Sequence, residues 1–349
     1  MSHSPLRRGV VLALAAASIF AALPATASAR PQDLKVMLRN VYLGADIVKL
    51  ATAQNKEEFE RNASVVYQTV LNNDFATRAK GIAREVRSRR PDIIGIQEAA
   101  TWRTGAKDDP APAANLVYDS TALLLRELSA LGLRYRLAGK RDWLDVEGPT
   151  TDQDVRIVQG DVILVRIGSK VRINRSFRGG YTEHLDVPTQ AGLAQSLRGW
   201  VGIDGRLAGR RFRLVTTHLE AYSPDIAARQ MAQLLAPGGP LASRRRQSIL
   251  MGDFNSAPAG NANDRGTSRD ASAYYNAIDV GFRNPLPMRA TCCFAEDLRS
   301  TSESLETWID HIVVRPRIRA LASGIVGTSQ VGGIFNSDHA GIWATLRLR

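Results

Sequence analysis

Apolar and polar residues follow two patterns along this chain. Runs of apolar or alternating residues predict strands, and apolar residues that recur every three to four positions predict helices. Residues 34–40 read as a strand with a polar end. Residues 76–90 have apolar residues at helical spacing and are predicted as an amphipathic helix, which Pro91 ends. Residues 92–98 then read as a buried strand that closes on a carboxylate. The apolar stripe of the helix consists of Ala79, Ile82, Ala83 and Val86.

The same patterns continue to the end of the chain. Residues 45–75 are predicted as a mixture of helix and loop, with helical pieces at 46–51 and 57–60. Strands at 196–203 and 211–217 flank Asp204-Gly205, which favours an antiparallel hairpin there. Hairpins mixed with strand–helix units argue against one parallel sheet, so we expect an α/β fold with two mixed sheets packed together and helices beside them. Further helices are predicted at 120–131 and 226–235, and further strands at 135–138, 161–166, 248–252, 307–314 and 342–348.

The N-terminus has the pattern of an export signal. Arg7 and Arg8 precede an apolar run over residues 9–23, and small residues follow up to Ala29. This order is typical of a secretory signal peptide. We therefore predict a signal peptide over residues 1–29, a mature chain of residues 30–349 and a secreted, extracellular protein. An N-terminal membrane anchor is the alternative, but the run is short for a membrane span. No later stretch is long and apolar enough to span a membrane.

The composition is that of a globular protein. Its 349 residues are 44% hydrophobic and 23% charged, which excludes a disordered, collagen-like or coiled-coil chain. The net charge of +12 favours an anionic partner such as nucleic acid. However, 39 of the 46 basic residues are arginine, a skew that the base composition of a genome can also produce. We expect a monomer, and nothing in the sequence indicates a protein partner.

The two cysteines, Cys292 and Cys293, are adjacent, so they cannot cross-link distant parts of the chain. A strained bond between neighbours is compatible with an oxidising compartment, and two inert or free thiols are the alternative. We favour the bond and assign the pair no catalytic role.

Polar clusters occur at the ends of predicted strands, where α/β sheets place their functional sites. Each cluster alone is weak, because a strand-end carboxylate can form a salt bridge and a single histidine is usually structural. The argument rests on the whole set and its order. The clusters are Asn40, Gln97-Glu98, Thr217-His218-Leu219-Glu220, Gly252-Asp253-Phe254-Asn255, Asp310-His311 and Ser337-Asp338-His339.

This ordered set resembles the endonuclease/exonuclease/phosphatase superfamily with the DNase I-like fold. The resemblance covers residues 34–348 and includes Pro91-Asp92-Ile93-Ile94-Gly95-Ile96-Gln97-Glu98 as its longest motif. It implies one domain over residues 30–349, built as a four-layer sandwich with two mixed β-sheets packed face to face and helices outside. The motifs are specific for the superfamily and do not define the substrate.

Hydrolysis of a phosphate ester requires an aligned water and neutralisation of charge on the phosphoryl oxygens. Mg²⁺ prefers a few carboxylate or amide oxygens, and we predict that Glu98, Asn40 and Asp338 hold it. Mn²⁺ or Ca²⁺ could take its place. No Cys/His cluster with the spacing of a structural zinc site is present in the sequence.

The resemblance implies the roles of the remaining residues. Asp253 would orient or deprotonate the attacking water, and Asn255 would hold the water or a phosphate oxygen. His339, oriented by Asp310, would donate to the phosphoryl group, while His218 would contact the phosphate or the leaving oxygen. His311 is interpreted as structural, because on a regular strand it points to the opposite face from Asp310.

Several substrates are compatible with this set. We rank a metal-dependent phosphodiesterase of the nuclease type first and a phosphatase of a small sugar or inositol phosphate second. A sphingomyelinase-like lipid phosphodiesterase comes third, because residues 181–193 are too polar and glycine-interrupted for an apolar membrane-engaging hairpin. The non-enzymatic alternative is a binding module on an inactive scaffold. Such a module should have lost a metal ligand or the Asp253/His339 pair, and both are present.

Overall fold

Two mixed β-sheets form the centre of the molecule, as the sequence predicts. The computed structural model describes residue 1 and residues 32–189, 192–258, 271–287 and 289–349, so the predicted signal peptide lies outside the described part apart from Met1. The first sheet has the strand order β13-β14-β1-β2-β5-β4, with β3 paired to β2. Its strands are β1 Leu34–Asn40, β2 Ile93–Ala106, β3 Asn115–Asp119, β4 Tyr135–Pro149, β5 Gln153–Arg166, β13 Arg319–Val326 and β14 Gly341–Arg347.

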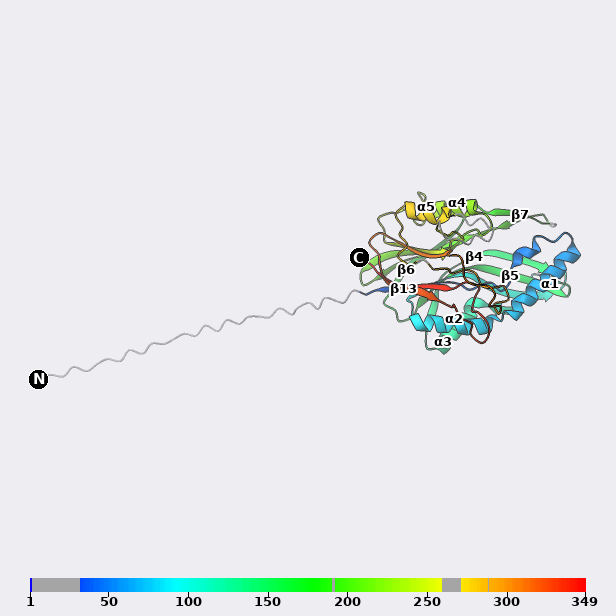
Figure 1. Cartoon of the computed structure of the whole chain (residues 1–349), viewed down its shortest axis with the longest axis horizontal. Coiled ribbons are helices and arrows are strands. Elements are labelled where there is room, and N and C mark those ends of the chain that lie inside the picture. Colours follow the sequence, from blue (N-terminus) through cyan, green and yellow to red (C-terminus); the bar gives the residue numbers. More distant parts are fainter. Residues whose placement is uncertain (2–31, 190–191, 259–270, 288) are drawn as a thin grey trace. The chain divides into compact units, whose positions relative to one another are not determined.

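The second sheet has the order β12-β11-β10-β9-β6. The pairs β1–β2 and β10–β11 are parallel, and the other neighbours in both sheets run antiparallel. A separate hairpin of β7 Leu185–Thr189 and β8 Gly192–Ser196 projects beside this sheet (Figure 1). The strands of the second sheet are β6 Arg172–Gly180, β9 Gly199–Leu207, β10 Arg210–His218, β11 Ser248–Asp253 and β12 Asp310–Arg315.

The largest apolar core lies between the two sheets. Val36 and Leu38 of β1 belong to the same cluster as Ile249 and Met251 of β11. Because side chains alternate along a strand, the next inward positions are Asn40 on β1 and Asp253 on β11. The packing of the two sheets therefore brings polar strand ends together at one edge of the core.

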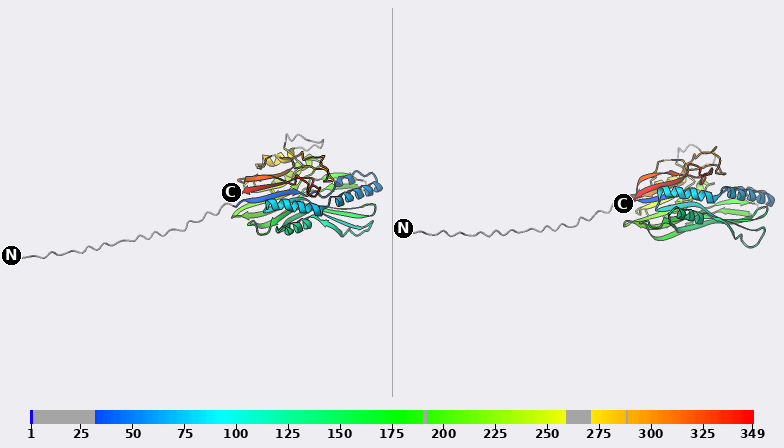
Figure 2. Two further views of the ribbon diagram at one scale, coloured as in Figure 1. Left: turned by 60° about the horizontal axis from the view of Figure 1, so that its bottom comes forward. Right: turned by 90° about the horizontal axis from the view of Figure 1, so that it is seen from below.

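Helices cover the outer faces of both sheets and complete four layers (Figures 1 and 2). α2 Phe75–Arg89 and α3 Ser120–Ala130 pack on the first sheet, where Ile82 and Leu128 share a core with Ile94 and Leu164. α4 Pro224–Leu235 and α5 Ser272–Asp279 cover the second sheet. This confirms the predicted four-layer sandwich.

The long segment between β1 and α2 follows the edge of the first sheet. It contains the short 3-10 helix η1 Ile47–Leu50 and α1 Lys56–Asn72. Val66 and Val70 of α1 pack against Trp102 of β2. The sequence predicts a helical piece only at 57–60 within this segment of helix and loop, so it underestimated the length of α1. None of the helices in the described ranges has the length and apolar character needed to cross a bilayer.

The predicted turn at Asp204-Gly205 is wrong, although the hairpin itself is present. Both residues lie inside β9, and the turn falls at Ala208-Gly209, where both backbones have positive φ, 48° and 80°. Asp204 is held in the strand by Arg213, whose Nε donates to it at 2.7 Å. A Cβ on Gly205 would come within 2.6 Å of the Phe212 ring, so the glycine makes room for cross-strand packing.

Candidate active site

A β-bulge places Glu98 at the site. The pairing of β2 with β5 shifts register between Ile96 and Ala99. Within the bulge, Glu98 has the left-handed φ of 58°, and Gln97 donates to Thr216 Oγ1 of the facing sheet at 2.6 Å. A bulge bends its strand and redirects side chains. Here it lets consecutive residues serve different places, with Gln97 between the sheets and Glu98 in the site.

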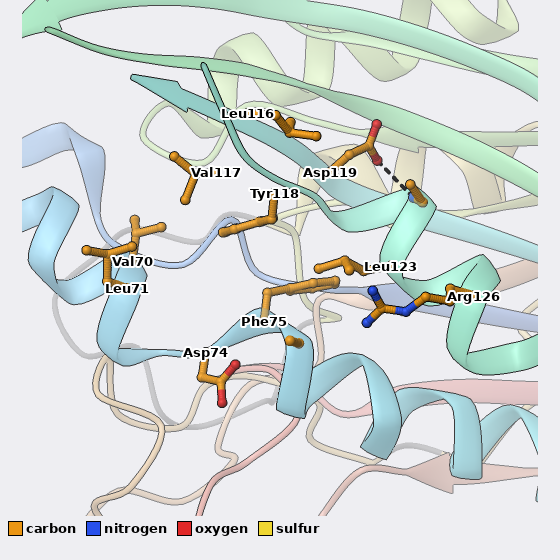
Figure 3. Close-up of a pocket in the computed structure, with 12 residues that line it drawn as sticks. Val70, Leu71, Asp74, Phe75, Leu116, Val117, Tyr118, Asp119, Leu123 and Arg126 are labelled. Carbon is orange, nitrogen blue, oxygen red and sulfur yellow. Dashed lines mark hydrogen bonds between the residues drawn. The ribbon is translucent and has the colours of Figure 1, made fainter. Parts of the chain in front are cut away.

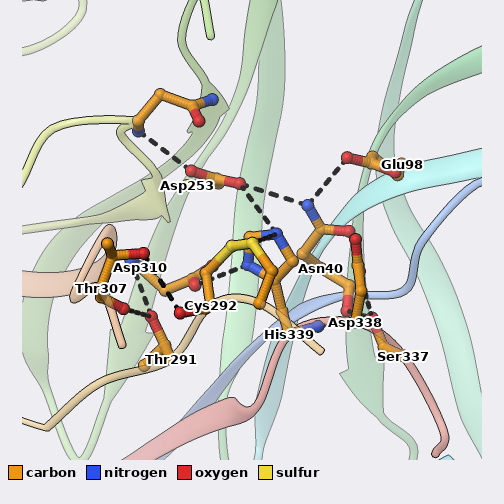
Figure 4. Close-up of a disulfide and its surroundings, with 12 residues drawn as sticks. Asn40, Glu98, Asp253, Thr291, Cys292, Thr307, Asp310, Ser337, Asp338 and His339 are labelled. Atoms are coloured by element: carbon orange, nitrogen blue, oxygen red, sulfur yellow. Dashed lines mark hydrogen bonds and ion pairs between the residues drawn. A yellow bond between two sulfur atoms is a disulfide. The ribbon is translucent and has the colours of Figure 1, made fainter. Parts of the chain in front are cut away.

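Asn40 joins carboxylates from both sheets. Its Nδ2 donates to Glu98 Oε1 at 2.9 Å and to Asp253 Oδ2 at 3.2 Å (Figure 4). Its Oδ1 accepts from the backbone N–H of Tyr42 at 2.9 Å, which determines the orientation of the amide. The backbone N–H of Leu43 donates to Glu98 Oε2 at 2.9 Å. Glu98 and Asp253 therefore lie on either side of a single amide nitrogen.

Asp253 lies between two histidines. Its Oδ2 is 3.6 Å from His218 Nε2 and 3.7 Å from His339 Nε2. The Nδ1–H of His339 donates to Asp310 Oδ2 at 2.8 Å, which leaves its Nε2 facing Asp253. Asp253, Asp310 and His339 are all buried and have ligand atoms within 4.8 Å of one another. His218, Asp253 and Asp310 end or begin three neighbouring strands, and His339 comes from the loop before β14.

The two histidines have opposite electrostatic environments. Burial lowers the pKa of His339, but Asp310, Asp338 and Asp253 together raise it to about 10. Burial lowers the pKa of His218 well below its ordinary value, and the charges of Arg198 and His339 lower it further. At neutral pH, His339 is therefore a cation and His218 is neutral.

Asn255 and Asp338 complete the predicted set. The backbone N–H of Asn255 donates to Asp253 Oδ1 at 3.0 Å, and its Nδ2 donates to the Leu219 carbonyl at 3.0 Å. Asp338 accepts from Ser337 Oγ at 3.2 Å, and the same hydroxyl lies 2.9 Å from the Asn40 carbonyl. The structure thus links all eight predicted site residues in one network of hydrogen bonds, ion pairs and close polar contacts, which neutral His218 joins through its 3.6 Å approach to Asp253.

The oxygen-rich side of this network fits a hard divalent cation. Glu98 and Asp338 are only half-buried, so each retains an accessible side. Burial raises the pKa of Asp338 to about 6, and repulsion from the Glu98 carboxylate contributes to the rise. A cation between such carboxylates would relieve this repulsion, and carboxylate and amide oxygens are the ligands that Mg²⁺, Mn²⁺ and Ca²⁺ prefer.

Arg198 and its neighbours border the site, although no sequence motif indicates them. The Arg198 guanidinium lies 4.8 Å from the centre of the Trp143 ring. The centres of the Trp143 and His218 rings are 5.9 Å apart, and the rings are nearly perpendicular. The Arg198 Nε is 3.6 Å from Glu220. Asp161 is fully buried nearby, and burial raises its pKa well above the ordinary value, while Arg198 opposes the rise. Trp143 lies on β4 and Asp161 on β5, while Arg198 directly precedes β9, whose first residue Gly199 pairs with His218. Only the pairing and packing of these strands brings the residues together.

Two other features lie outside the network. His311 faces the outer layer, where its Nε2–H donates to the Ser256 carbonyl at 2.8 Å and its ring contacts Phe254 and Tyr274. A pocket of about 490 Å³ lies among α1, α2, α3 and β3, lined by residues such as Phe75 and Tyr118 (Figure 3). It contains none of the predicted site residues.

The chain belongs to the Endonuclease/Exonuclease/phosphatase family, whose model matches residues 62–339. Family members hydrolyse phosphoester bonds, so the protein is a phosphoester hydrolase. No curated protein matches the chain.

Solved structures share the fold at low sequence identity. A family protein from Leptotrichia buccalis C-1013-b has a TM-score of 0.56 at 15% identity, over 90% of this chain and 100% of that one. A mannosyl-6-phosphatase from Bacteroides thetaiotaomicron VPI-5482 has a TM-score of 0.55 at 17% identity, over 90% and 99%. D. rerio TDP2, complexed with a single-strand DNA product, has a TM-score of 0.51 at 16% identity, over 90% and 99%.

Proposed function

We propose that this protein is a secreted, divalent-metal-dependent phosphodiesterase of the nuclease type. The observation that carries the proposal is the position of Asp253, which lies 3.6 and 3.7 Å from the inner nitrogens of His218 and His339 and accepts from Asn40 at 3.2 Å. Such a carboxylate can take a proton from a water, while the groups around it stabilise charge on a phosphate.

The residues would divide the work as follows. Asp253 orients and deprotonates the attacking water, and Asn40 holds the carboxylate in place. His339, cationic because of Asp310 and its other acidic neighbours, donates to a phosphoryl oxygen as negative charge develops. His218, neutral at pH 7, is available to contact the phosphate or the leaving oxygen.

Glu98 and Asp338, with Asn40, would hold the cation, with Mg²⁺ as our first choice. When bound, a divalent cation screens the charge of the phosphate and polarises its oxygens. Mn²⁺ and Ca²⁺, the alternative cations predicted from the sequence, also prefer oxygen ligands. Excess chelator should therefore abolish turnover, and each metal added back in turn would identify the preferred one.

The choice of a polyanionic diester over a small monoester rests on charge. Without residues 1–29, which hold two arginines and no acid, the chain keeps a net charge of +10, from 44 basic and 34 acidic residues. A basic surface attracts nucleic acid through its phosphates. Fold relatives include both a phosphatase and a protein complexed with a DNA product, so they do not separate the two alternatives.

A substrate panel tests the proposal directly. Purified protein with Mg²⁺ would be assayed against plasmid DNA, RNA, sphingomyelin and a set of sugar and inositol monophosphates. We expect cleavage of nucleic acid, and we expect Asp253→Asn to lose about 10²–10⁴-fold in rate while keeping the fold. Turnover confined to monophosphates would favour the phosphatase alternative, and turnover of none would favour the binding module.

Export through residues 1–29 is part of the proposal. It rests on the arginine pair, the apolar run and the small residues before Arg30. N-terminal sequencing of protein recovered from the culture medium should begin at Arg30. Protein that keeps Met1 and stays with the cells would contradict export.

A further inference from the structure

The adjacent cysteines lie directly against the site. Cys293 Sγ is 4.0 Å from His339 Nε2, the nitrogen that also faces Asp253. The two cysteines form a disulfide, in which Cys292 is buried and Cys293 is partly exposed. Cys293 is therefore the member of the pair that solvent reaches, and its sulfur is the one that contacts the histidine.

The backbone around the pair is hydrogen-bonded to the segment that carries His339. The N–H of Phe294 donates to the Asp338 carbonyl at 2.8 Å, and the N–H of Ala340 donates to the Thr291 carbonyl at 2.7 Å. On the other side, Cys292 and Thr307 exchange backbone hydrogen bonds at 3.0 and 2.8 Å, three residues before Asp310. A rearrangement at the cysteines would thus reach both members of the His339–Asp310 pair.

This disulfide is poorly explained as a structural cross-link. The stabilisation that a disulfide provides increases with the length of the loop it closes. Neighbouring residues close almost no loop, so a bond between them barely restricts the unfolded chain. Its position beside His339 calls for another reason.

We propose that Cys292–Cys293 is a thiol–disulfide modification site. A dithiol reductant that opens the bond displaces the neighbouring His339 and so lowers the rate of phosphoester hydrolysis. The proposal rests on the proposed function for its activity readout. When the bond breaks, the two sulfur atoms change from bonded to non-bonded contact and must move apart. Cys293 already contacts the imidazole, and the flanking Thr291 and Phe294 are hydrogen-bonded to the segment that carries His339. The movement of the sulfurs therefore displaces the ring or its loop.

The exchange is a two-electron reaction. A thiolate of the reductant attacks Cys293 Sγ, forms a mixed disulfide and releases Cys292 as a thiolate, which takes a proton from solvent. The second thiol of the reductant, deprotonated, then attacks its own sulfur in the mixed disulfide. Cys293 leaves as a thiolate and is protonated, and the reductant becomes a cyclic disulfide. The protein disulfide is reduced by two electrons and the dithiol is oxidised by two.

The test combines a thiol count with an activity assay. Because the sequence contains only these two cysteines, the count reports the pair directly. Air-purified full chain should show no reactive thiol, and after dithiothreitol and its removal it should show two and gain the mass of two hydrogen atoms. Hydrolysis of bis(4-nitrophenyl) phosphate with Mg²⁺ should fall about 10–100-fold, as expected for a misplaced catalytic group, and recover after diamide.

The control variant is Cys292→Ser/Cys293→Ser, whose rate should respond to neither reagent. If this variant does not fold, Cys293→Ser alone serves, since it leaves Cys292 without a neighbour to bond. Unchanged activity in protein that carries two thiols would overturn the proposal. Thiols that diamide cannot oxidise would also overturn it. The same holds if dithiothreitol lowers the activity of the serine variant as much as that of the wild type.

A second readout separates this proposal from the proposed function. If neither the oxidised nor the reduced form hydrolyses any ester, the proposed function fails. The imidazole NMR signals then show whether reduction of the cysteine pair still alters the surroundings of His339. The His339 signal, assigned with His339→Gln, should shift between the oxidised and reduced forms while His184 does not. Identical His339 signals in both forms would overturn the proposal.

Discussion

His339 and Asp310 form the shortest contact among the predicted catalytic side chains, with Nδ1 and Oδ2 2.8 Å apart. Arg39, a buried arginine held by Glu85 at 3.1 Å, donates to the carbonyl of His339 and supports its backbone. Asp310 therefore holds the imidazole ring of His339, and Arg39 holds its backbone. This geometry makes the histidine and the aspartate one functional unit rather than two independent groups.

A double-mutant cycle tests this unit. We expect His339→Ala to lose about 10²–10⁴-fold in kcat/KM and Asp310→Asn about 10–100-fold. Adding Asp310→Asn to His339→Ala should cost little more, because an aspartate that acts through the imidazole has nothing left to orient. Additive losses in the double variant would show that Asp310 acts on its own.

His311 is expected to make stability depend on pH. Its Nε2–H donates to the Ser256 carbonyl, and its buried Nδ1 has no hydrogen-bond partner among the described residues. Burial lowers its pKa to about 4, from 6.5. Because the unfolded chain binds a proton below pH 6.5 and the folded chain does not, stability is complete above pH 6.5 and falls as the pH drops towards 4.

The effect on the free energy of unfolding should be about 2 kcal/mol at pH 5. Urea unfolding of the wild type and of His311→Gln, which keeps a donor for Ser256, would be compared at pH 7.5 and pH 5. The difference between the two proteins removes other titrating groups that they share. An equal loss of stability in both would exclude His311 as the cause.

At the scale of elements, α2 holds the loops that present the site. Arg78 on this helix is fully buried, and its guanidinium donates to the carbonyls of Val41, Tyr42 and Asn73. Two of these carbonyls directly follow Asn40, and a fourth contact reaches Asn336 just before Ser337. One helix side chain therefore fixes the positions of two site segments.

Replacing Arg78 tests this role. Arg78→Met leaves several buried carbonyls without a donor, so the free energy of unfolding should fall by about 3 kcal/mol or more. Arg84→Met, an exposed arginine of the same helix, should change it by less than about 0.5 kcal/mol. If Arg78→Met and Arg84→Met change the free energy of unfolding equally in chemical denaturation, Arg78 does not hold these site segments in place.

At the scale of the molecule, the positive charge should control how substrates are held. If the substrate is nucleic acid, log kcat/KM should fall linearly with log salt, and two phosphate contacts already give about a tenfold loss between 50 and 200 mM. A small chromogenic diester assayed in parallel should change little, because it makes no extended phosphate contacts. A flat salt dependence for DNA and RNA would favour the small phosphomonoester.

The sequence by itself determined several of the elements and named the polar residues that the structure brings together. Local periodicity predicts a strand or a helix because it depends on neighbours a few positions apart. For the same reason it identified β1, α2 and the inner part of β2, and the ordered strand-end motifs named the eight polar residues that the structure links. The hairpin turn at Ala208-Gly209 was misplaced, because its position depends on contacts between the two strands and a local pattern does not contain such contacts.

The tertiary structure alone decided how the named residues meet. Asn40 and Asp253 are 213 residues apart, and their contact depends on how the two sheets pack. The bulge at Glu98, the buried Arg78 and the cluster of Arg198 and Trp143 depend on strand register and on which face is covered. The Cys293–His339 contact likewise joins two loops with no common pattern. Such contacts carry no local signal, since their energy comes from distant groups that only the fold brings together.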